Sequence, residues 1–206
     1  MISTHAYNEL FRTVSSMDTV NLMNSLMLRD PVTYQHSVRV ALLAEKFADQ
    51  LKLTEAGRRQ FTRGCFLHDV GKLLIPEQIL MKCGKLNSWE WGEMKKHTLY
   101  GEGLLSHEFQ SDSEVMNIVR YHHERYDGLG YPYGLAGDNI PLLARACSII
   151  DAFDAMAYGR AYQTRKSLSD IWHELERNAG TQFDSDLLLQ FLEAAPRLLY
   201  LYPHTN

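Results

Sequence analysis

The chain has 206 residues, 45% of them hydrophobic, and a formal net charge of -4 at pH 7. This length and apolar content predict one domain with a substantial buried core, and they exclude an intrinsically disordered chain. The slight excess of acidic residues excludes the basic surface that long nucleic acids require, so we expect any nucleotide ligand to be small. The sequence contains no secretory leader and no apolar run long enough for a membrane span. We therefore expect a cytoplasmic protein with no membrane partner.

Apolar residues recur at helical spacing through most of the chain. Val40, Ala44 and Phe47 form one stripe with His36 a turn before it. Further helices are expected up to Gly71, in one piece after a capping box of Asn87 and Glu90, over 115–123, over 142–157, and as a final pair over 167–178 and 184–199. Alternating strand patterns and internal repeats are absent from the sequence. These patterns predict an all-α bundle of roughly seven or more helices.

Two connections stand out. The glycine-rich stretch 124–141 is longer than compact helical folds usually carry without a function, so we expect it to form an active-site loop. The stretch "RDPVT" at 29–33 separates an N-terminal helical extension, residues 1–29, from a catalytic domain over 30–206. The extension is either a dimerisation helix or a helix that packs on the same core.

Histidines and carboxylates gather at inward positions of the predicted helices. A single inward histidine is more often a hydrogen-bonded core residue than a metal ligand. Here, however, five of the nine histidines lie on the inward face or at the C-terminal end of four helices, and carboxylates accompany them: His36, His68, His97, His122 and His123, with Asp69 and Asp151. Burying so many titratable groups is costly unless a cation compensates, so the pattern predicts a metal site. The three cysteines share no CxxC spacing, which argues against thiolate ligands.

The order of these residues resembles that of the HD-GYP family of metal-dependent phosphodiesterases. The resemblance is carried by His36, "HDVGK" (68–72), "MKKH" ending at His97, "HHERYDGLGYP" (122–132) and Asp151 in "IIDAFDAM", and it extends from Leu28 to Phe191. It implies the all-helical HD-superfamily fold. It also implies hydrolysis of the bacterial second messenger cyclic di-GMP to pGpG by a metal-bridging hydroxide, with onward hydrolysis to GMP left open.

The resemblance also implies a ligand set. His36, His68, Asp69 and Asp151 would hold one divalent metal, and Asp69 would bridge to a second held by His97, His122 and His123. Tyr131 and Arg160 fall where the family contacts substrate. Imidazole and carboxylate ligands without thiolate favour iron or manganese. Two metals about 3.5–4 Å apart would activate a shared water and stabilise both the attacking and the leaving oxygen.

Lys72 has two interpretations. Its ammonium could contact a phosphate oxygen or the leaving alkoxide, which makes it a catalytic and substrate-binding candidate beside Asp69. Alternatively, it could interact with the C-terminus of the preceding helix. Glu124 and Asp127 are also open, as partners that orient imidazoles or as caps inside the loop.

The sequence departs from the family pattern at three positions. Val32 stands where some members carry a glutamate associated with a third metal, so we expect two metals. Gln163 replaces an expected basic residue, which puts one phosphate contact in doubt. Ser185 replaces a proline and is expected to affect only the start of a helix.

The leading hypothesis is an active cyclic di-GMP phosphodiesterase. A module that senses cyclic di-GMP with little turnover is the alternative from a different class, and a phosphohydrolase for another cyclic dinucleotide is a third. Partners beyond the nucleotide would be a second copy of the chain or an upstream sensory or receiver domain.

Overall fold

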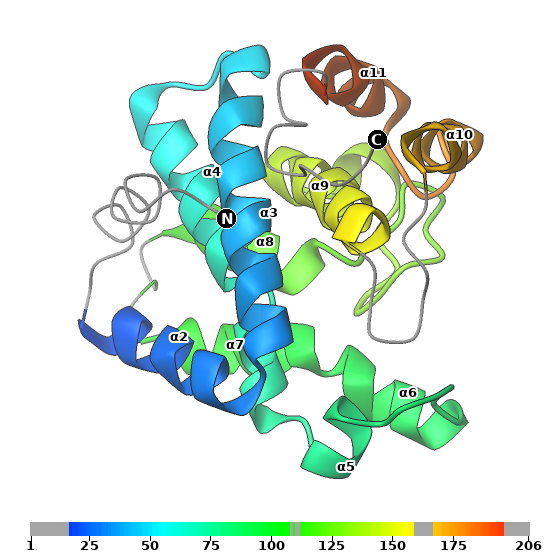
Figure 1. Ribbon diagram of the computed structural model, residues 1–206. Helices are drawn as coiled ribbons and strands as arrows, with labels where there is room; N and C mark the ends of the chain where they lie inside the picture. The colour runs from blue at the N-terminus through cyan, green and yellow to red at the C-terminus, as the bar shows by residue number, and fades with distance from the viewer. Residues whose placement is uncertain (1–16, 108, 110–111, 159–166, 196–206) are drawn as a thin grey trace.

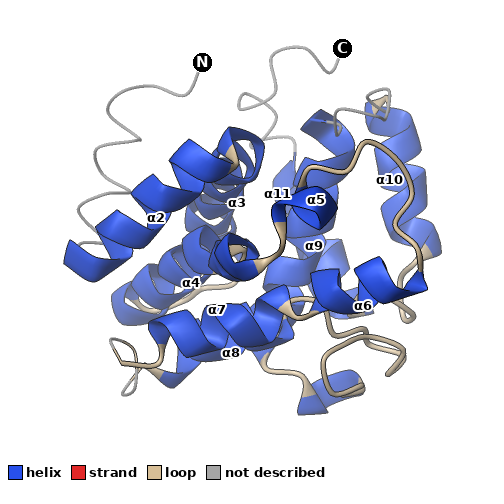
Figure 2. Cartoon of the chain, turned by 90° about the horizontal axis from the view of Figure 1, so that it is seen from below, coloured by secondary structure: helices blue, strands red, loops and turns tan. Residues whose placement is uncertain are grey.

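The computed structural model describes residues 17–107, 109, 112–158 and 167–195, and within these the chain is helical (Figures 1 and 2). The helices are α2 (Met17–Arg29), α3 (Pro31–Gln50), α4 (Glu55–Leu67), α5 (Glu77–Leu80), α6 (Ser88–Lys95), α7 (His97–Leu105), α8 (Ser113–Tyr121), α9 (Leu142–Tyr158), α10 (Leu168–Arg177) and α11 (Ser185–Ala194), with 3₁₀ helices η1 (Val70–Leu74) and η2 (Gly137–Asn139). No strand occurs in this part of the chain. The all-α prediction is confirmed.

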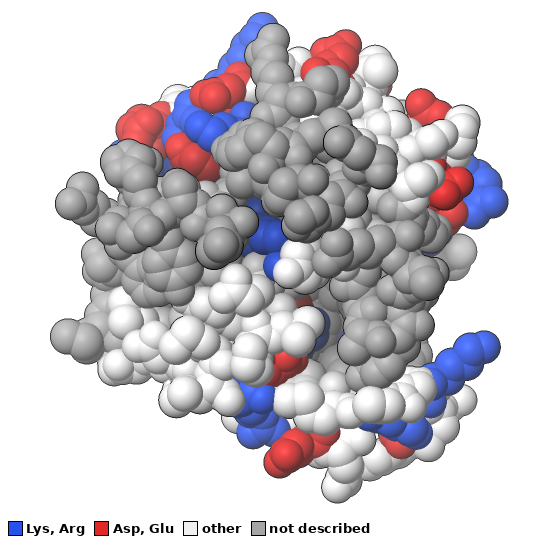
Figure 3. Space-filling view, in the orientation of Figure 1, with Lys and Arg blue, Asp and Glu red and all other residues white. Residues whose placement is uncertain are grey.

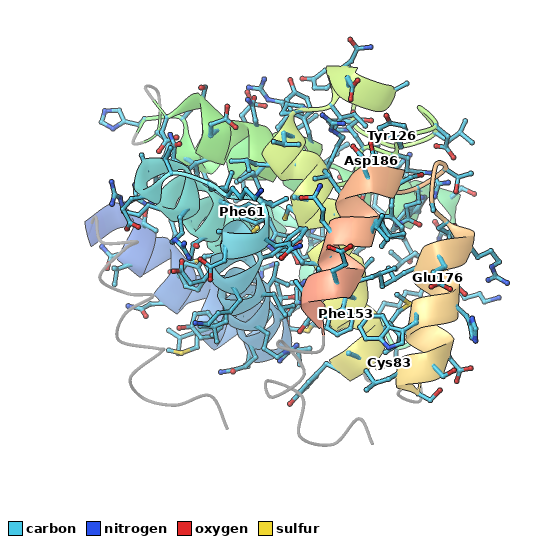
Figure 4. The ribbon with its side chains drawn as sticks, turned by 90° about the horizontal axis from the view of Figure 1, so that it is seen from above. Phe61, Cys83, Tyr126, Phe153, Glu176 and Asp186 are labelled. Atoms are coloured by element: carbon cyan, nitrogen blue, oxygen red, sulfur yellow. The ribbon has the colours of Figure 1, made fainter. Side chains whose placement is uncertain are left out.

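Helix α3 is the centre of the fold, and it lies against α2, α4 and α9 (Figure 1). One face of α3 joins a core cluster that contains Phe47, Phe61, Phe153 and Phe191, all fully buried. Figure 4 shows Phe61 on α4 and Phe153 on α9 within this helical packing. A second cluster lies on the side of α2 and includes Met23 and Leu26. Because α3 contributes to both clusters, its position is set from two sides.

Helix α2 packs on the same core as the rest of the described chain. Met23 and Leu26 are fully buried, and the Arg29 guanidinium donates to the Ile75 carbonyl at 2.7 Å. The side chain of Asp30 then accepts the Thr33 amide and caps α3, whose first residue is Pro31. The division of the chain at residue 30 stays a prediction. None of the helices in the described residues is long and apolar enough to cross a bilayer.

The capping box of Asn87 and Glu90 is present, but the single helix expected after it is two helices. The Lys96 amide donates to the Glu93 carbonyl, a bond to the third residue back that tightens the last turn of α6. The chain then restarts as α7 at His97. The break leaves carbonyls of the last turn of α6 available, and the Nδ1–H of His97 donates to one of them, that of Met94, at 2.8 Å.

Two glycines let η1 and α7 approach closely. A Cβ on Gly71 would lie 1.9 Å from the His97 carbonyl oxygen and 2.4 Å from the Gly101 amide nitrogen. A Cβ on Gly101 would lie 2.8 Å from Val119 of α8. Only residues without a side chain fit this crossing. The crossing brings the segment after α4 beside the first turn of α7, and so places Asp69 near His97.

Gly71→Ala is therefore expected to lower the free energy of unfolding by about 1–3 kcal/mol or more, because the new methyl group meets backbone that cannot yield cheaply. Gly103→Ala on the exposed face of α7 is the control, since a Cβ there meets nothing within 4 Å. The control should be neutral or stabilising by up to about 1 kcal/mol. Denaturant unfolding of both variants measures this, and equal stability of the two would contradict the packing argument.

Candidate metal centre

Five segments of the chain bring their polar side chains to one place. His36 comes from α3, His68 and Asp69 follow α4, His97 begins α7, His122 and His123 follow α8, and Asp151 comes from α9. Two groups have one ligand atom per residue within 4.8 Å of one another: His36, His68 and Asp69, and Asp69, His97, His122 and His123. Asp151 adjoins the first group, with its Oδ1 2.9 Å from Nε2 of His36 and 3.9 Å from Nε2 of His68. Asp69 is thus common to both groups.

Three of the imidazoles are oriented by backbone carbonyls. The Nδ1–H of His68 donates to the Cys65 carbonyl at 2.7 Å, and that of His122 to the Ile118 and Val119 carbonyls at 3.1 Å. His97 uses the Met94 carbonyl in the same way. Each acceptor is one of the last carbonyls of the preceding helix, or lies at its broken end, where backbone acceptors lack helical partners. With Nδ1 protonated, each Nε2 carries a lone pair directed at the centre.

Asp69 lies where these lone pairs meet. Its Oδ1 is 3.4 Å from Nε2 of His97, and its Oδ2 is 3.4 Å from Nε2 of His68 and accepts a 2.6 Å hydrogen bond from Nζ of Lys72. The carboxylate is buried. Burial alone would raise its pKa, but the Lys72 ammonium holds the pKa of Asp69 well below its usual range. Asp69 is therefore ionised at neutral pH.

His36 is held by two carboxylates of α9. Its Nε2 lies 2.9 Å from Asp151 and its Nδ1 2.6 Å from Asp154. Asp154 is fully buried and accepts two bonds from the guanidinium of Arg39, at 2.8 and 2.9 Å. The Arg39 guanidinium also lies 3.7 Å from the centre of the Tyr158 ring. This chain of contacts fixes the imidazole plane of His36.

His36 differs in pKa from the histidines of the second group. Burial lowers the pKa of His36, but its hydrogen bonds with Asp151 and Asp154 outweigh that effect and raise it to about 9. Burial lowers the pKa of His97 to about 4 and that of His123 to about 3, and it holds the pKa of His122 well below its usual value. At pH 7 the three histidines of the second group are therefore neutral and can donate lone pairs to a cation. A cation that binds His36 must first displace a proton from it.

The residues present fit a bound divalent metal. His68 Nε2 and Asp69 Oδ1 are buried and have no hydrogen-bond partner among the described residues. Unpaired buried polar atoms are costly, and a cation is the partner that both a neutral imidazole and an ionised carboxylate can share. The donor set is nitrogen and oxygen only. It suits a catalytic first-row metal better than a thiolate-bound structural zinc.

The glycine-rich loop is held by its own acidic residues. The buried carboxylate of Glu124 accepts the amides of Tyr133, Gly134 and Leu135 at 2.7, 3.2 and 3.0 Å. The carboxylate of Asp127 accepts hydrogen bonds from Nε and Nη2 of Arg125 and from the Leu129 amide. Of the two roles considered, these contacts support the one inside the loop.

Tyr131 lies at the edge of the centre. Its amide donates to the His123 carbonyl at 3.1 Å, and the ring centroids of Tyr131 and His123 are 4.9 Å apart. The peptide bond between Tyr131 and Pro132 is cis. The tyrosine ring predicted to meet substrate is thus adjacent to an imidazole of the second group.

The remaining predicted positions divide into two sets. Arg160 and Gln163 lie outside the described residues. Ser185 is the first residue of α11, which Asp184 caps, as expected for a helix start. Val32 is exposed near the start of α3.

Sequence reasoning missed Asp154 and Arg39. The available signal was spacing: Asp154 follows Asp151 by three residues, and Arg39 follows His36 by three, so each shares a helix face with a predicted ligand.

Comparison with known proteins agrees with this geometry. A family model described as an HD domain matches residues 21–187. The chain belongs to the HD domain family. This confirms the predicted superfamily. The chain is 38% identical over 174 residues to "3'3'-cGAMP-specific phosphodiesterase 2" of Vibrio cholerae, covering 84% of this chain and 33% of that protein.

A second curated relative is the "Cyclic di-GMP phosphodiesterase" of Thermotoga maritima, 33% identical over 190 residues, which cover 90% of this chain and 51% of the relative. The chain thus spans a third to a half of the length of these relatives. The fold of this HD domain is also that of an HDG"Y"P protein from Bdellovibrio bacteriovorus, with a TM-score of 0.66, 21% identity, and coverage of 81% of this chain and 53% of that one. These relatives agree with the HD-GYP resemblance.

Asp154→Asn is expected to weaken metal binding about 10- to 100-fold, because the amide keeps the shape but loses the charge that orients His36. Asp186→Asn on α11 removes an equal charge from an exposed position and should leave affinity unchanged. Metal titration of both variants followed by metal analysis measures the difference. Equal affinities would show that Asp154 serves packing alone.

The metal-free protein is expected to lose stability as the pH falls from about 6.5 to about 5. In this window the unfolded chain binds protons at its histidines, with pKa near 6.5, whereas His97 and His123 stay neutral when folded. Each contributes a slope of up to about 1.4 kcal/mol per pH unit. His36 acts on the other side: its contribution is complete below about pH 6.5 and is lost as the pH rises through about 9.

Unfolding in the presence of a chelator, measured across this pH range, tests the expectation. His97→Gln should remove one histidine's share of the acid-side slope. A flat profile between pH 6.5 and 5 would contradict the neutral, buried state of these imidazoles.

Proposed function

We propose that this HD domain hydrolyses a cyclic dinucleotide, with cyclic di-GMP as the favoured substrate, and that the reaction depends on two divalent metals. The observation that carries the proposal is the position of Asp69, a buried, ionised carboxylate whose two oxygens face two separate groups of histidines. A carboxylate placed in this way is suited to bridge two cations. Phosphodiester hydrolysis at neutral pH is a reaction that such a pair serves well.

The first metal would be held by His36, His68, Asp69 and Asp151, and the second by Asp69, His97, His122 and His123. Iron or manganese suits these ligands, because they offer imidazole nitrogen and carboxylate oxygen without thiolate. When bound, the metals supply Lewis-acid activation of a water molecule and stabilise the attacking and leaving oxygens. Two aspartates offset only part of their charge, so the centre keeps a positive charge that attracts a phosphodiester.

Lys72 holds its ammonium within the same centre. Its Nζ donates to Asp69 Oδ2 at 2.6 Å and its side chain is largely buried. This contact favours a role at the site over one at the end of α4. We propose that Lys72 keeps Asp69 ionised and oriented, and that its remaining N–H groups donate to a phosphate oxygen or to the leaving alkoxide, where negative charge develops. Backbone carbonyls hold the imidazoles of His68, His97 and His122, so these side chains need not move to bind a metal.

The curated relatives support the substrate class. One is named for 3'3'-cGAMP and another for cyclic di-GMP, and both substrates are cyclic dinucleotides that contain guanine. Figure 3 shows acidic and basic side chains interspersed over the described part of one face, with no continuous basic band of the kind a long nucleic acid would need. The ring of Tyr131 lies beside that of His123, which supports the proposal that it contacts a nucleoside of the substrate.

A module that binds cyclic di-GMP without turnover remains the second candidate function. The proposed substrate is a bacterial second messenger, so a cytoplasmic location belongs to the same proposal. A second copy of the chain or an upstream sensory domain would supply regulation.

The deciding experiment is turnover of cyclic di-GMP by protein purified without oxygen and loaded with iron or manganese, with the products identified by chromatography. We expect pGpG to form. Asp69→Ala should lower the rate by about two orders of magnitude or more, because it removes a ligand from both metals. Asp186→Ala, which removes an exposed carboxylate from α11, should retain the rate. Binding of cyclic di-GMP without hydrolysis would favour the sensor.

A further inference from the structure

Helix α6 places a tryptophan beside the candidate metal centre. The ring centroid of Trp91 is 6.1 Å from that of Tyr131, and the two ring planes meet at 84°. Tyr131 in turn lies 4.9 Å from His123 and 6.4 Å from His97. A series of aromatic rings therefore leads from the second histidine group to α6. Trp91 and Tyr131 meet edge to face, so their ring planes are not stacked on each other.

Trp91 is not part of the hydrophobic core. It is 47% exposed, and it belongs to neither buried cluster of the described chain. A half-exposed indole offers apolar area and a flat ring to a ligand, and Trp91 differs from the more exposed Trp89 in its contact with Tyr131 beside the centre. The helix that carries it is nevertheless well held: Glu90 closes the capping box with Asn87 and accepts two bonds from Lys82, at 2.7 and 2.6 Å. The indole is thus presented from a fixed position.

Lys95 occupies the same side of α6. It follows Trp91 by four residues, about one helical turn, so the two side chains are neighbours on the helix surface. Its ammonium lies 5.9 Å from the centre of the Tyr131 ring. The two residues thus approach the same tyrosine from one helix face, and they offer an aromatic plane and a hydrogen-bond donor side by side.

We propose that Trp91 and Lys95 bind a guanine of the substrate, an inference that rests on the proposed function and specifies it. The indole stacks on the purine while the phosphodiester lies at the metal centre. The Lys95 ammonium donates to O6 and N7 of guanine. Adenine offers N7 but places an amino donor where guanine has O6, so the same lysine discriminates between the two bases.

Trp91→Ala tests the stacking contact. The KM for cyclic di-GMP should rise roughly tenfold or more, whereas Trp91→Phe should retain most of the affinity because a ring remains. In Trp91→Ala the loss on bis(p-nitrophenyl) phosphate, which has no purine, should be much smaller than the loss on cyclic di-GMP. Trp89→Ala is the matched control: Trp89 is 62% exposed, and two positions along α6 place it on the other side of the helix. Equal losses from both alanine variants would overturn the proposal, since they would indicate a general disturbance of α6.

Lys95→Met tests the choice of base. The ratio of kcat/KM for cyclic di-GMP to that for cyclic di-AMP should fall several-fold, mainly through the guanine substrate. Equal losses on both substrates, or a loss on bis(p-nitrophenyl) phosphate, would assign Lys95 to the phosphate and refute base reading. If the wild-type protein hydrolyses no cyclic dinucleotide, the proposed function fails. Calorimetric Kd values of the same variants for cyclic di-GMP then decide the base contact separately.

Discussion

The whole centre depends on keeping one ionised carboxylate buried among imidazoles. A carboxylate in an apolar interior would ordinarily take up a proton, because its charge loses the stabilisation of water. Asp69 keeps its charge chiefly through the ammonium of Lys72, which donates to Oδ2. The residues around it follow from this requirement. Lys72, three positions along on η1, supplies the positive charge beside Asp69. The imidazole lone pairs that face the carboxylate repel it, so they suit the site only once a cation lies between them.

The helix ends meet that requirement with ordinary backbone groups. A helix that stops leaves carbonyl oxygens without partners, and an imidazole placed just after the last turn can donate to one of them. His68 and His122 both follow this rule, and His97 follows a version of it at the break between α6 and α7. His36 is the exception, because it lies within α3 and uses Asp154 in place of a carbonyl. Two carboxylates therefore border His36, and its pKa is raised, whereas burial lowers those of His97 and His122.

The all-α fold and the presence of a metal site could be predicted from helical periodicity and its inward histidines, and the set of seven candidate ligands from the resemblance to the HD-GYP motifs. Inward histidines at helical spacing are visible in one dimension. The role of Glu124 could not be decided from the sequence, because three amides turn toward its carboxylate only once the loop has folded. Likewise, the break at Lys96 carries no proline or glycine signal at that residue. The contact between Trp91 and Tyr131 could not be predicted either, because the two residues are far apart in the chain and no local sequence pattern relates them.

The bond between His36 and Asp154 joins residues 118 positions apart. Contacts between such distant residues cannot form until most of the intervening chain has collapsed, because closing a long segment costs entropy that only later packing repays. The first histidine group is therefore assembled by tertiary structure and not by any local unit. A nascent or partly folded chain would offer a cation scattered, weak ligands, so high-affinity metal capture would report that folding is complete.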